Sequence, residues 1–139
     1  MSRYCIDTSA YSRFKLGDGN VVDVLERAEW IGVPTVVLGE LWTGFLLGGS
    51  LRKNEAELHE FLENPVVEVI EVDHHVARVY AEIVVDLRRA GTPIPTNDIW
   101  IAASAARAGA TVLTYDIHYR SVSRVGSLCL PVGQPGRRD

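Results

Sequence analysis

Four acidic residues stand at points of the sequence where their carboxylates can act together, namely Asp7, Glu40, Asp98 and Asp116. Carboxylates that gather without His or Cys select hard cations that prefer oxygen, which means Mg²⁺, with Mn²⁺ as a substitute. Such an ion binds phosphate oxygens, lowers the pKa of a bound water, and stabilises the attacking and leaving oxygens of an in-line displacement. The chemistry that these residues would support is the hydrolysis of a phosphodiester.

Three of these acids also have a purely structural interpretation. Asp7 fits the N-cap of a short helix over "TSAYSRF", and Asp116 fits the same role before "IHYRSV". Asp98 lies in the first turn of an alanine-rich helix, where a carboxylate offsets the helix dipole and Thr96 or Asn97 provides the cap. The residues themselves leave both interpretations open.

Glu40 is harder to explain as a structural residue. Its neighbours include Val37, Leu41 and Trp42, which leave the helix little polar face. A Glu buried there would need a partner, because an isolated buried charge is costly. No Lys or Arg lies within one helical turn of it, so a metal ion is a good candidate for that partner.

The spacing of apolar residues predicts the elements that must position these acids. Strands that alternate with helices predict an α/β fold, a three-layer sandwich with a mainly parallel central sheet flanked by helices. We expect strands at residues 3–7, 33–37, 65–73, 111–116 and 128–132, the last at an edge. We expect helices at residues 20–32, 38–48, 51–64, 74–90 and 96–108, with Gly32, Gly91 and Gly109 ending three of them.

Ligands of such sheets bind beyond the carboxyl ends of the strands, where the strand order reverses. Asp7 and Asp116 each end a predicted strand, Glu40 lies one helical turn past another, and Asp98 opens the helix before the last buried strand. All four carboxylates are therefore expected at one edge of the sheet. His74 and His75 follow a different strand, and we do not expect them to take part.

Composition limits the class of protein. The chain has 139 residues and is expected to be a single domain over residues 1–139, with about 133–139 as a frayed tail. No apolar run approaches the ~20 residues of a membrane span and no leader opens the chain, so we expect a cytoplasmic protein without a membrane partner. The net charge of -4 argues against broad adhesion to nucleic acid, although bound cations neutralise acids and phosphates together. Cys5 and Cys129 lie in apolar runs and are expected to be buried free thiols.

Four short motifs carry a resemblance to a known family. The segments "IDTSA", "GELWTG", "PTNDIWIAASA" and "VLTYDIHY" resemble the motifs of PIN-domain proteins, specifically the VapC toxins of bacterial toxin–antitoxin pairs. The resemblance runs from Tyr4 to about Val132, and the last two acids are 116 − 98 = 18 residues apart. "DTS" alone is a weak signal, but the ordered set of four motifs is specific.

The resemblance implies a PIN-like fold and a Mg²⁺-dependent endoribonuclease toxin, which acts on RNA, forms a homodimer and is neutralised by a cognate antitoxin. The four acids match the residues that the family uses for catalysis and metal binding. Supporting positions, where hydroxyls or amides orient the acids, fall on Thr8, Ser9, Asn97 and Thr114. Tyr119 departs from the family, which commonly has Phe at that position.

One helix is rich enough in large apolar residues to line a groove for another chain. Trp42, Phe45 and Leu46 crowd this helix ahead of the amphipathic segment 51–64. Packing into the core is the plain alternative for each of them. We expect the helical pair to form part of the groove that receives the antitoxin.

Other functions fit the sequence less well. A receiver-type phosphoacceptor needs paired acids after the first strand and a Lys after the last strands, but Lys15 and Lys53 both come early. A haloacid-dehalogenase-like phosphatase needs an Asp two residues after Asp7, where Ser9 stands. A PIN-fold RNA-processing nuclease outside a toxin–antitoxin pair, and a PIN fold that only binds, stay open as alternatives.

Overall fold

Five parallel strands form one sheet at the centre of the computed structural model, which describes residues 2–133. The strand order is β3-β2-β1-β4-β5, so the α/β prediction with a parallel sheet is confirmed. Of the predicted frayed tail, all but Gly133 lies outside the described residues. The strands are β1 (Arg3–Ile6), β2 (Trp30–Pro34), β3 (Val67–Ile70), β4 (Thr111–Thr114) and β5 (Ser127–Cys129).

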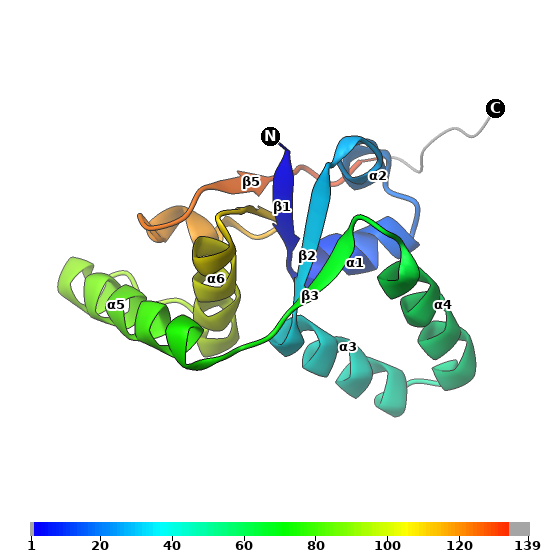
Figure 1. Ribbon diagram of the computed structural model, residues 1–139, viewed down its shortest axis with the longest axis horizontal. Helices are drawn as coiled ribbons and strands as arrows, with labels where there is room; N and C mark the ends of the chain where they lie inside the picture. The colour runs from blue at the N-terminus through cyan, green and yellow to red at the C-terminus, as the bar shows by residue number, and fades with distance from the viewer. Residues whose placement is uncertain (1, 134–139) are drawn as a thin grey trace.

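Helices cover both faces of this sheet and complete the three layers (Figure 1). Helix α6 packs against β1, β2 and β4 with α5 beside it, while α1 packs against β1 and β4 from the other side. Helices α3 and α4 lie on the side of α1 and make a lobe beyond the sheet. The helices are α1 (Thr8–Lys15), α2 (Gly19–Arg27), α3 (Thr35–Leu47), α4 (Leu51–Glu63), α5 (His74–Ala90), α6 (Thr96–Ala108) and the 3₁₀ turn η1 (Ile117–Ser121).

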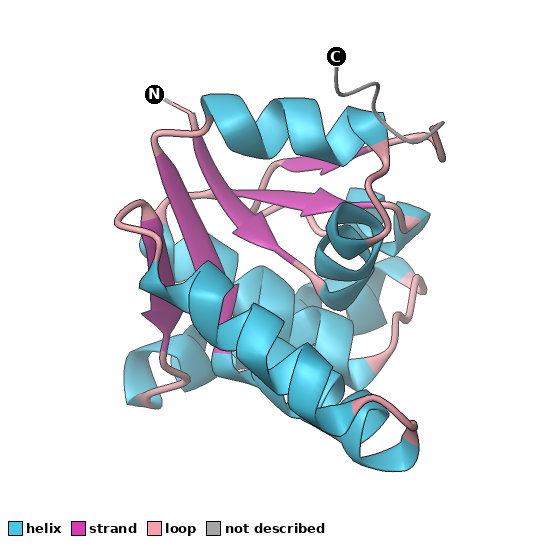
Figure 2. Ribbon diagram, turned by 90° about the vertical axis from the view of Figure 1, so that its right-hand side faces the viewer, coloured by secondary structure: helices cyan, strands magenta, loops and turns pink. Residues whose placement is uncertain are grey.

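Consecutive residues of β1 and β4 are buried because both faces of these strands are covered. Cys5 and Ile6 of β1 and Val112 and Leu113 of β4 have no exposed surface. Parallel strands between two helical layers show this pattern instead of alternation. Figure 2 shows the strands fanning out across the sheet, as the twist of such sheets requires.

Strand order reverses between β1 and β4. From β1 the chain adds β2 and then β3 on one side, and only afterwards places β4 on the other side of β1. The carboxyl ends of these two neighbouring strands, at Ile6 and Thr114, are therefore where a ligand crevice is expected.

Predicted boundaries on both sides of β2 are wrong. The strand expected at residues 33–37 is Trp30–Pro34, and the next helix begins at Thr35 instead of residue 38, because the apolar run gives no signal of where the strand ends. The expected helix over residues 20–32 ends at Arg27, and β2 begins at Trp30, so Gly32 lies inside a strand and caps no helix. A Cβ at Gly32 would meet the ring of Trp30 at 2.4 Å and the Ile70 side chain at 2.6 Å. The strand needs glycine there because these side chains fill the space above it.

The other predicted helix ends are confirmed. Gly91 and Gly109 follow α5 and α6 in the left-handed conformation, with φ of 68° and 66°, which glycine adopts without strain. Both cysteines are free, with Cys5 buried and Cys129 only half-buried. Among residues 2–133, no helix combines the length and apolar character needed to cross a lipid bilayer.

Candidate active site

Asp7 is the most deeply buried of the four acids, with 4% of its surface exposed. It follows β1 and caps α1, where its Oδ1 accepts hydrogen bonds from the Ala10 amide at 2.9 Å and the Ser9 hydroxyl at 2.7 Å. The Thr114 hydroxyl donates to its Oδ2 at 2.5 Å. A carboxylate has about four lone-pair positions, so these three donors leave one on Oδ2 for a cation.

The hydroxyls that hold Asp7 are themselves fixed by the backbone after β4. Ser9 Oγ accepts from the Tyr115 amide at 3.0 Å, and Thr114 Oγ1 accepts from the Asp116 amide at 2.8 Å. Each hydroxyl has one proton, which these acceptor roles leave free to point at Asp7. The start of α1 and the end of β4 are thereby joined around one carboxylate.

Burial raises the pKa of the Asp7 carboxyl above its usual value. The donors Thr114, Ser9 and Ala10 oppose this rise because they stabilise the charged form, whereas the negative charge of Asp98 adds to it. A cation beside Asp7 would favour the charged form and so offset both effects.

Asp98 and Asp116 converge on one imidazole ring. His118 Nδ1 lies 3.0 Å from Asp98 Oδ2 and 3.0 Å from Asp116 Oδ1. Among the described residues, these three side chains form the group whose ligand atoms all lie within 4.8 Å of one another. The side chains are 19%, 36% and 42% exposed for Asp98, Asp116 and His118, so the group opens to solvent.

Local backbone structure explains how the group forms. Asp98 lies in the first turn of α6, and Asp116 caps η1 through a hydrogen bond from the His118 amide to its Oδ1 at 2.8 Å. Helix α6 contacts η1 directly. Capping a helix and binding a cation are therefore compatible roles for Asp7 and Asp116, because a cap uses only some of the lone pairs of a carboxylate.

The second oxygen of Asp98 has its own partner. The Tyr119 hydroxyl donates to Asp98 Oδ1 at 3.2 Å, from a side chain with no exposed surface. Burial and the nearby charges of Asp7 and Asp98 raise the pKa of the Tyr119 phenol far above its usual value, so it stays protonated and donates. Tyr119, where the family commonly has Phe, thus contacts Asp98.

Glu40 lies in the second turn of α3 and is half-buried. Its partner is the Thr8 hydroxyl, which donates to Glu40 Oε1 at 2.7 Å and links α1 to α3. Neither Glu40 nor Asp7 belongs to the tight group around His118. The four acids thus fall into a close pair and two acids that hydroxyls hold separately.

The prediction that Thr96 or Asn97 caps α6 is wrong. The helix begins at Thr96 with Pro95 as its N-cap, and no side chain provides a capping hydrogen bond. Thr96 and Asn97 are therefore helical residues rather than caps, because Pro95 already holds the extended conformation that ends at the helix. The side chain of Asn97 is exposed, and its supporting role stays a prediction.

The sequence interpretation missed His118. It predicted a donor set without nitrogen, and the structure corrects this by placing an imidazole against two of the acids. The available signal was the spacing "DIH", because a residue two positions after a capping Asp returns toward it in a tight 3₁₀ turn. The contact with Asp98, 118 − 98 = 20 residues away, depends on how α6 packs against η1.

This donor set fits a hard divalent cation. Asp98 Oδ2 and Asp116 Oδ1 lie within 4.8 Å of each other, and like-charged carboxylates at such short range favour a cation between them. Asp7 lies outside this group and keeps one lone pair of Oδ2 free. The half-exposed rim leaves room for a phosphate to approach the ion. The arrangement can bind a metal and a phosphodiester side by side.

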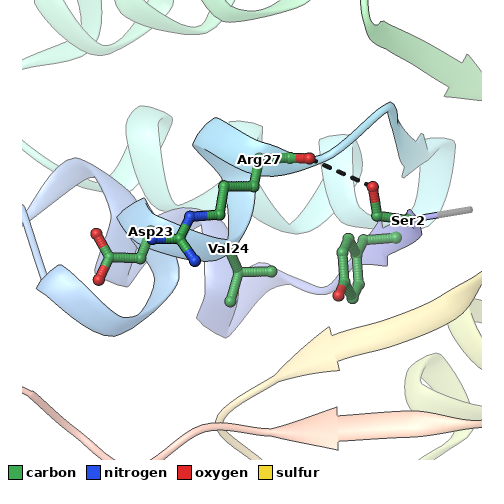
Figure 3. Close-up of a pocket in the computed structure, with 5 residues that line it drawn as sticks. Ser2, Asp23, Val24 and Arg27 are labelled. Carbon is green, nitrogen blue, oxygen red and sulfur yellow. Dashed lines mark hydrogen bonds between the residues drawn. The ribbon is translucent and has the colours of Figure 1, made fainter.

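A separate cavity lies at the opposite, amino edge of the sheet, where α2 ends beside the start of β1 (Figure 3). It measures about 220 Å³, and the Ser2 hydroxyl donates to the Arg27 carbonyl at its rim. Its lining residues are Ser2, Tyr4, Asp23, Val24 and Arg27. None of the four acids lines it, so it is not part of this site.

The apolar helix α3 divides between core and surface. Trp42 and Phe45 meet edge to face at 5.9 Å and are half-buried, whereas Leu46 is 67% and Leu47 85% exposed. A groove of about 260 Å³ runs between α1, α3 and α4, and of the predicted groove residues only Phe45 lines it. Its lining residues are Tyr11, Ser12, Lys15, Leu16, Leu41, Phe45, Asn54 and Glu57.

Comparison with known proteins places these features in a family. Residues 4–125 match the PIN domain family. The chain is 35% identical over 97 residues to the ribonuclease VapC4 of Mycobacterium tuberculosis, covering 70% of this chain and 74% of that protein. It is 28% identical over 131 residues to the ribonuclease VapC2 of Rickettsia felis, covering 91% and 95%.

Solved structures are similar in fold. The VapBC2 complex of Rickettsia felis, bound to a DNA fragment from its promoter, matches with a TM-score of 0.78 and 25% identity, covering 91% of this chain and 97% of that chain. VapBC-1 of nontypeable Haemophilus influenzae matches with a TM-score of 0.80 at 17% identity, covering 91% and 96%. At that identity the second likeness concerns the fold alone.

Proposed function

Since this chain belongs to the PIN-domain family and, within it, to the VapC ribonucleases, we propose that it is a toxin that hydrolyses RNA phosphodiesters. The proposed enzyme is an endoribonuclease that needs a divalent cation and is neutralised by a cognate antitoxin. The observation that carries the proposal is the convergence of Asp98 and Asp116 at the edge of the sheet where Asp7 is fixed between β1 and β4.

We propose that Asp7, Glu40, Asp98 and Asp116 hold Mg²⁺, or Mn²⁺ in its place. A bound ion of this kind makes a water more acidic and offsets the negative charge that develops on the phosphate oxygens. The carboxylates of Asp98 and Asp116 are close enough to share one ion, while Asp7 and Glu40 offer oxygens from the neighbouring strand end and helix.

The surrounding side chains keep these acids in place. Thr114 and Ser9 fix Asp7, Thr8 fixes Glu40, and Tyr119 fixes Asp98. Fixed acids lose little freedom when substrate binds, which is how preorganised sites gain rate. Because these donors are in place before substrate arrives, the reacting phosphate meets a rigid set of charges.

The proposed partner is a cognate antitoxin that binds along α3 and α4. Several similar structures are toxin–antitoxin complexes, among them VapBC2 of Rickettsia felis and VapBC-5 of Mycobacterium tuberculosis. The exposed Leu46 and Leu47 and the groove beside Phe45 offer apolar surface that a partner helix would cover. We also propose that the chain forms a homodimer and, because its substrate is cellular RNA, that it works in the cytoplasm.

Cleavage of RNA by the purified chain tests the proposal. Activity in Mg²⁺ or Mn²⁺ is expected, together with its loss in excess chelator and its return when metal is restored. Equal cleavage in chelator would rule out the metal-based chemistry, and the absence of cleavage under every metal condition would favour a PIN fold that only binds.

A further inference from the structure

We infer that His118 binds the metal ion directly through Nδ1, which makes the site favour Mn²⁺ over Mg²⁺. The inference rests on the proposed metal site and adds to it a ligand and a choice of ion. Three observations carry it: the position of the ring between two acids, the chemistry of imidazole, and the way the backbone holds the residue in place.

The ring lies where a shared ion would bring a third ligand. His118 Nδ1 is 3.0 Å from Asp98 Oδ2 and 3.0 Å from Asp116 Oδ1, so one nitrogen faces both carboxylates. In octahedral coordination with bonds of about 2.1 Å, neighbouring ligand atoms stand about 3.0 Å apart. The same distance is that of the hydrogen bond between His118 Nδ1 and Asp98 Oδ2. The nitrogen thus lies at ligand spacing from both carboxylate oxygens, and binding of the ion releases the proton that Nδ1 shares with them.

Imidazole changes which ion this site prefers. Mg²⁺ is bound almost wholly by oxygen, whereas first-row transition ions accept imidazole nitrogen, and affinity rises along that series from Mn²⁺. Among those ions, Mn²⁺ also suits carboxylate and water ligands, which make up the rest of this site. A mixed set of carboxylate oxygens and one imidazole nitrogen thus favours Mn²⁺ over Mg²⁺.

The backbone places His118 without help from its ring. Its amide donates to Asp116 Oδ1 at 2.8 Å, and the next residue, Tyr119, is fully buried. These contacts survive when the imidazole is replaced, so a substitution tests the ring and spares the fold. The other three histidines are elsewhere: His59 pairs with Glu55 on α4 at 3.8 Å, and His74 and His75 lie together at the start of α5.

The test compares the wild-type chain with His118→Gln and with His59→Gln as the matched control. Calorimetric titrations with Mn²⁺ alone and Mg²⁺ alone measure affinity without RNA. Pulsed electron paramagnetic resonance of the Mn²⁺-bound chain reports nitrogen in the coordination sphere, because a directly bound imidazole gives a ¹⁴N modulation of the electron spin echo. Wild type and His59→Gln should show this modulation, and His118→Gln should not.

Removal of a side chain that only orients a metal ligand weakens metal binding by about tenfold or more. Loss of a direct ligand should therefore weaken Mn²⁺ binding by at least about tenfold. Mg²⁺ binding should weaken less, so the preference for Mn²⁺ should narrow. Bound Mn²⁺ without ¹⁴N modulation in the wild type overturns this inference even if affinity falls in His118→Gln, while leaving the proposed function in place. A wild type that binds neither ion and cuts no RNA overturns both.

Discussion

The Thr114 hydroxyl donates to Asp7 Oδ2 at 2.5 Å, in a contact that is buried between β1 and β4. Thr114 has no exposed surface, and its oxygen also accepts from the Asp116 amide. One hydroxyl therefore orients Asp7, a proposed ligand just after β1, and the backbone of Asp116, another just after β4.

Replacing Thr114 with valine, which has nearly the same shape, should destabilise the chain. The change leaves a buried carboxylate oxygen and the Asp116 amide without their partner, at a cost of about 1–3 kcal/mol. Thermal or urea unfolding measures the effect. The control is Thr111→Val in the same strand, which is half-buried and should shift the midpoint far less. Equal shifts in the two variants would contradict the assigned role of Thr114.

Glu40→Gln should keep the fold and lose activity. The amide oxygen of Gln can still accept the hydrogen bond from Thr8, so the melting temperature should change little. The loss of the charge should reduce RNA cleavage and metal affinity by at least about tenfold. Steady-state cleavage rates and Mn²⁺ titrations measure this. A variant that cuts RNA and binds Mn²⁺ as the wild type does would remove Glu40 from the site.

Leu46→Glu should weaken antitoxin binding without unfolding the toxin. Leu46 is 67% exposed, so a charge there costs the folded chain little, but it would be buried beneath a bound partner helix. We expect a loss of at least about 1 kcal/mol in binding to the product of the adjacent reading frame. Val85→Glu on α5, at an apolar position 42% exposed, is the control. Unchanged binding by Leu46→Glu would remove the exposed apolar face of α3 from the proposed antitoxin interface.

The segment after η1 is held to α5 by an ion pair that acid should release. The Arg124 guanidinium donates to Asp86 at 2.5 Å and holds the pKa of that carboxyl below its usual value. The folded pKa is lower than the unfolded value of about 3.9, so the pair stabilises the fold above that pH and the benefit is lost as pH falls through the folded pKa. Asp86→Asn should therefore melt slightly below the wild type at pH 7, because Arg124 keeps its pair with Glu82. The difference between the two melting temperatures should close as pH falls below about 3.9 and through the folded pKa of Asp86. A gap that stays constant with pH would contradict the assignment.

Much of the fold follows from local sequence signals, and the wrong boundaries around β2 show where those signals stop. The ends of α5 and α6 were predictable because Gly91 and Gly109 follow long periodic segments. The start of α3 was not, because residues 30–47 are largely apolar and no change of period marks the end of β2. That boundary depends on the Trp30 ring packing over Gly32, a contact that local propensity does not encode.

The candidate site divides in the same way. The sequence predicts that Asp7 and Asp116 lie at the same edge of the sheet, because each follows a parallel strand and the carboxyl ends of such strands gather there. The partner of Glu40 and the ring between the other two acids were not found, because they depend on how α1 packs beside α3 and how α6 packs beside η1. The position of a residue in a helix determines which face of that helix it lies on. It does not determine which residue of a neighbouring helix it contacts.

Asp98 is the residue at which the proposed metal site is tested most directly. A carboxylate in the first turn of a helix is explained either by the start of the helix or by metal binding. Two carboxylates about 5 Å apart at an effective dielectric constant of about 20 repel by roughly 3 kcal/mol, so Asp98→Asn relieves repulsion while it loses charge attraction to His118. In chelator the variant should therefore melt close to the wild type. Asp73→Asn at the start of α5 is the matched control.

The most direct measurement is the rise in melting temperature on adding Mn²⁺ or Mg²⁺, recorded beside RNA cleavage for the wild type, Asp98→Asn and Asp73→Asn. Binding to the folded state produces that rise, so a lost ligand must reduce it. We predict that the wild type and Asp73→Asn gain stability from metal and cut RNA, while Asp98→Asn gains little and cuts almost none. An Asp98→Asn variant with the full metal-induced rise and normal cleavage would contradict the account and leave Asp98 as a helix-start residue.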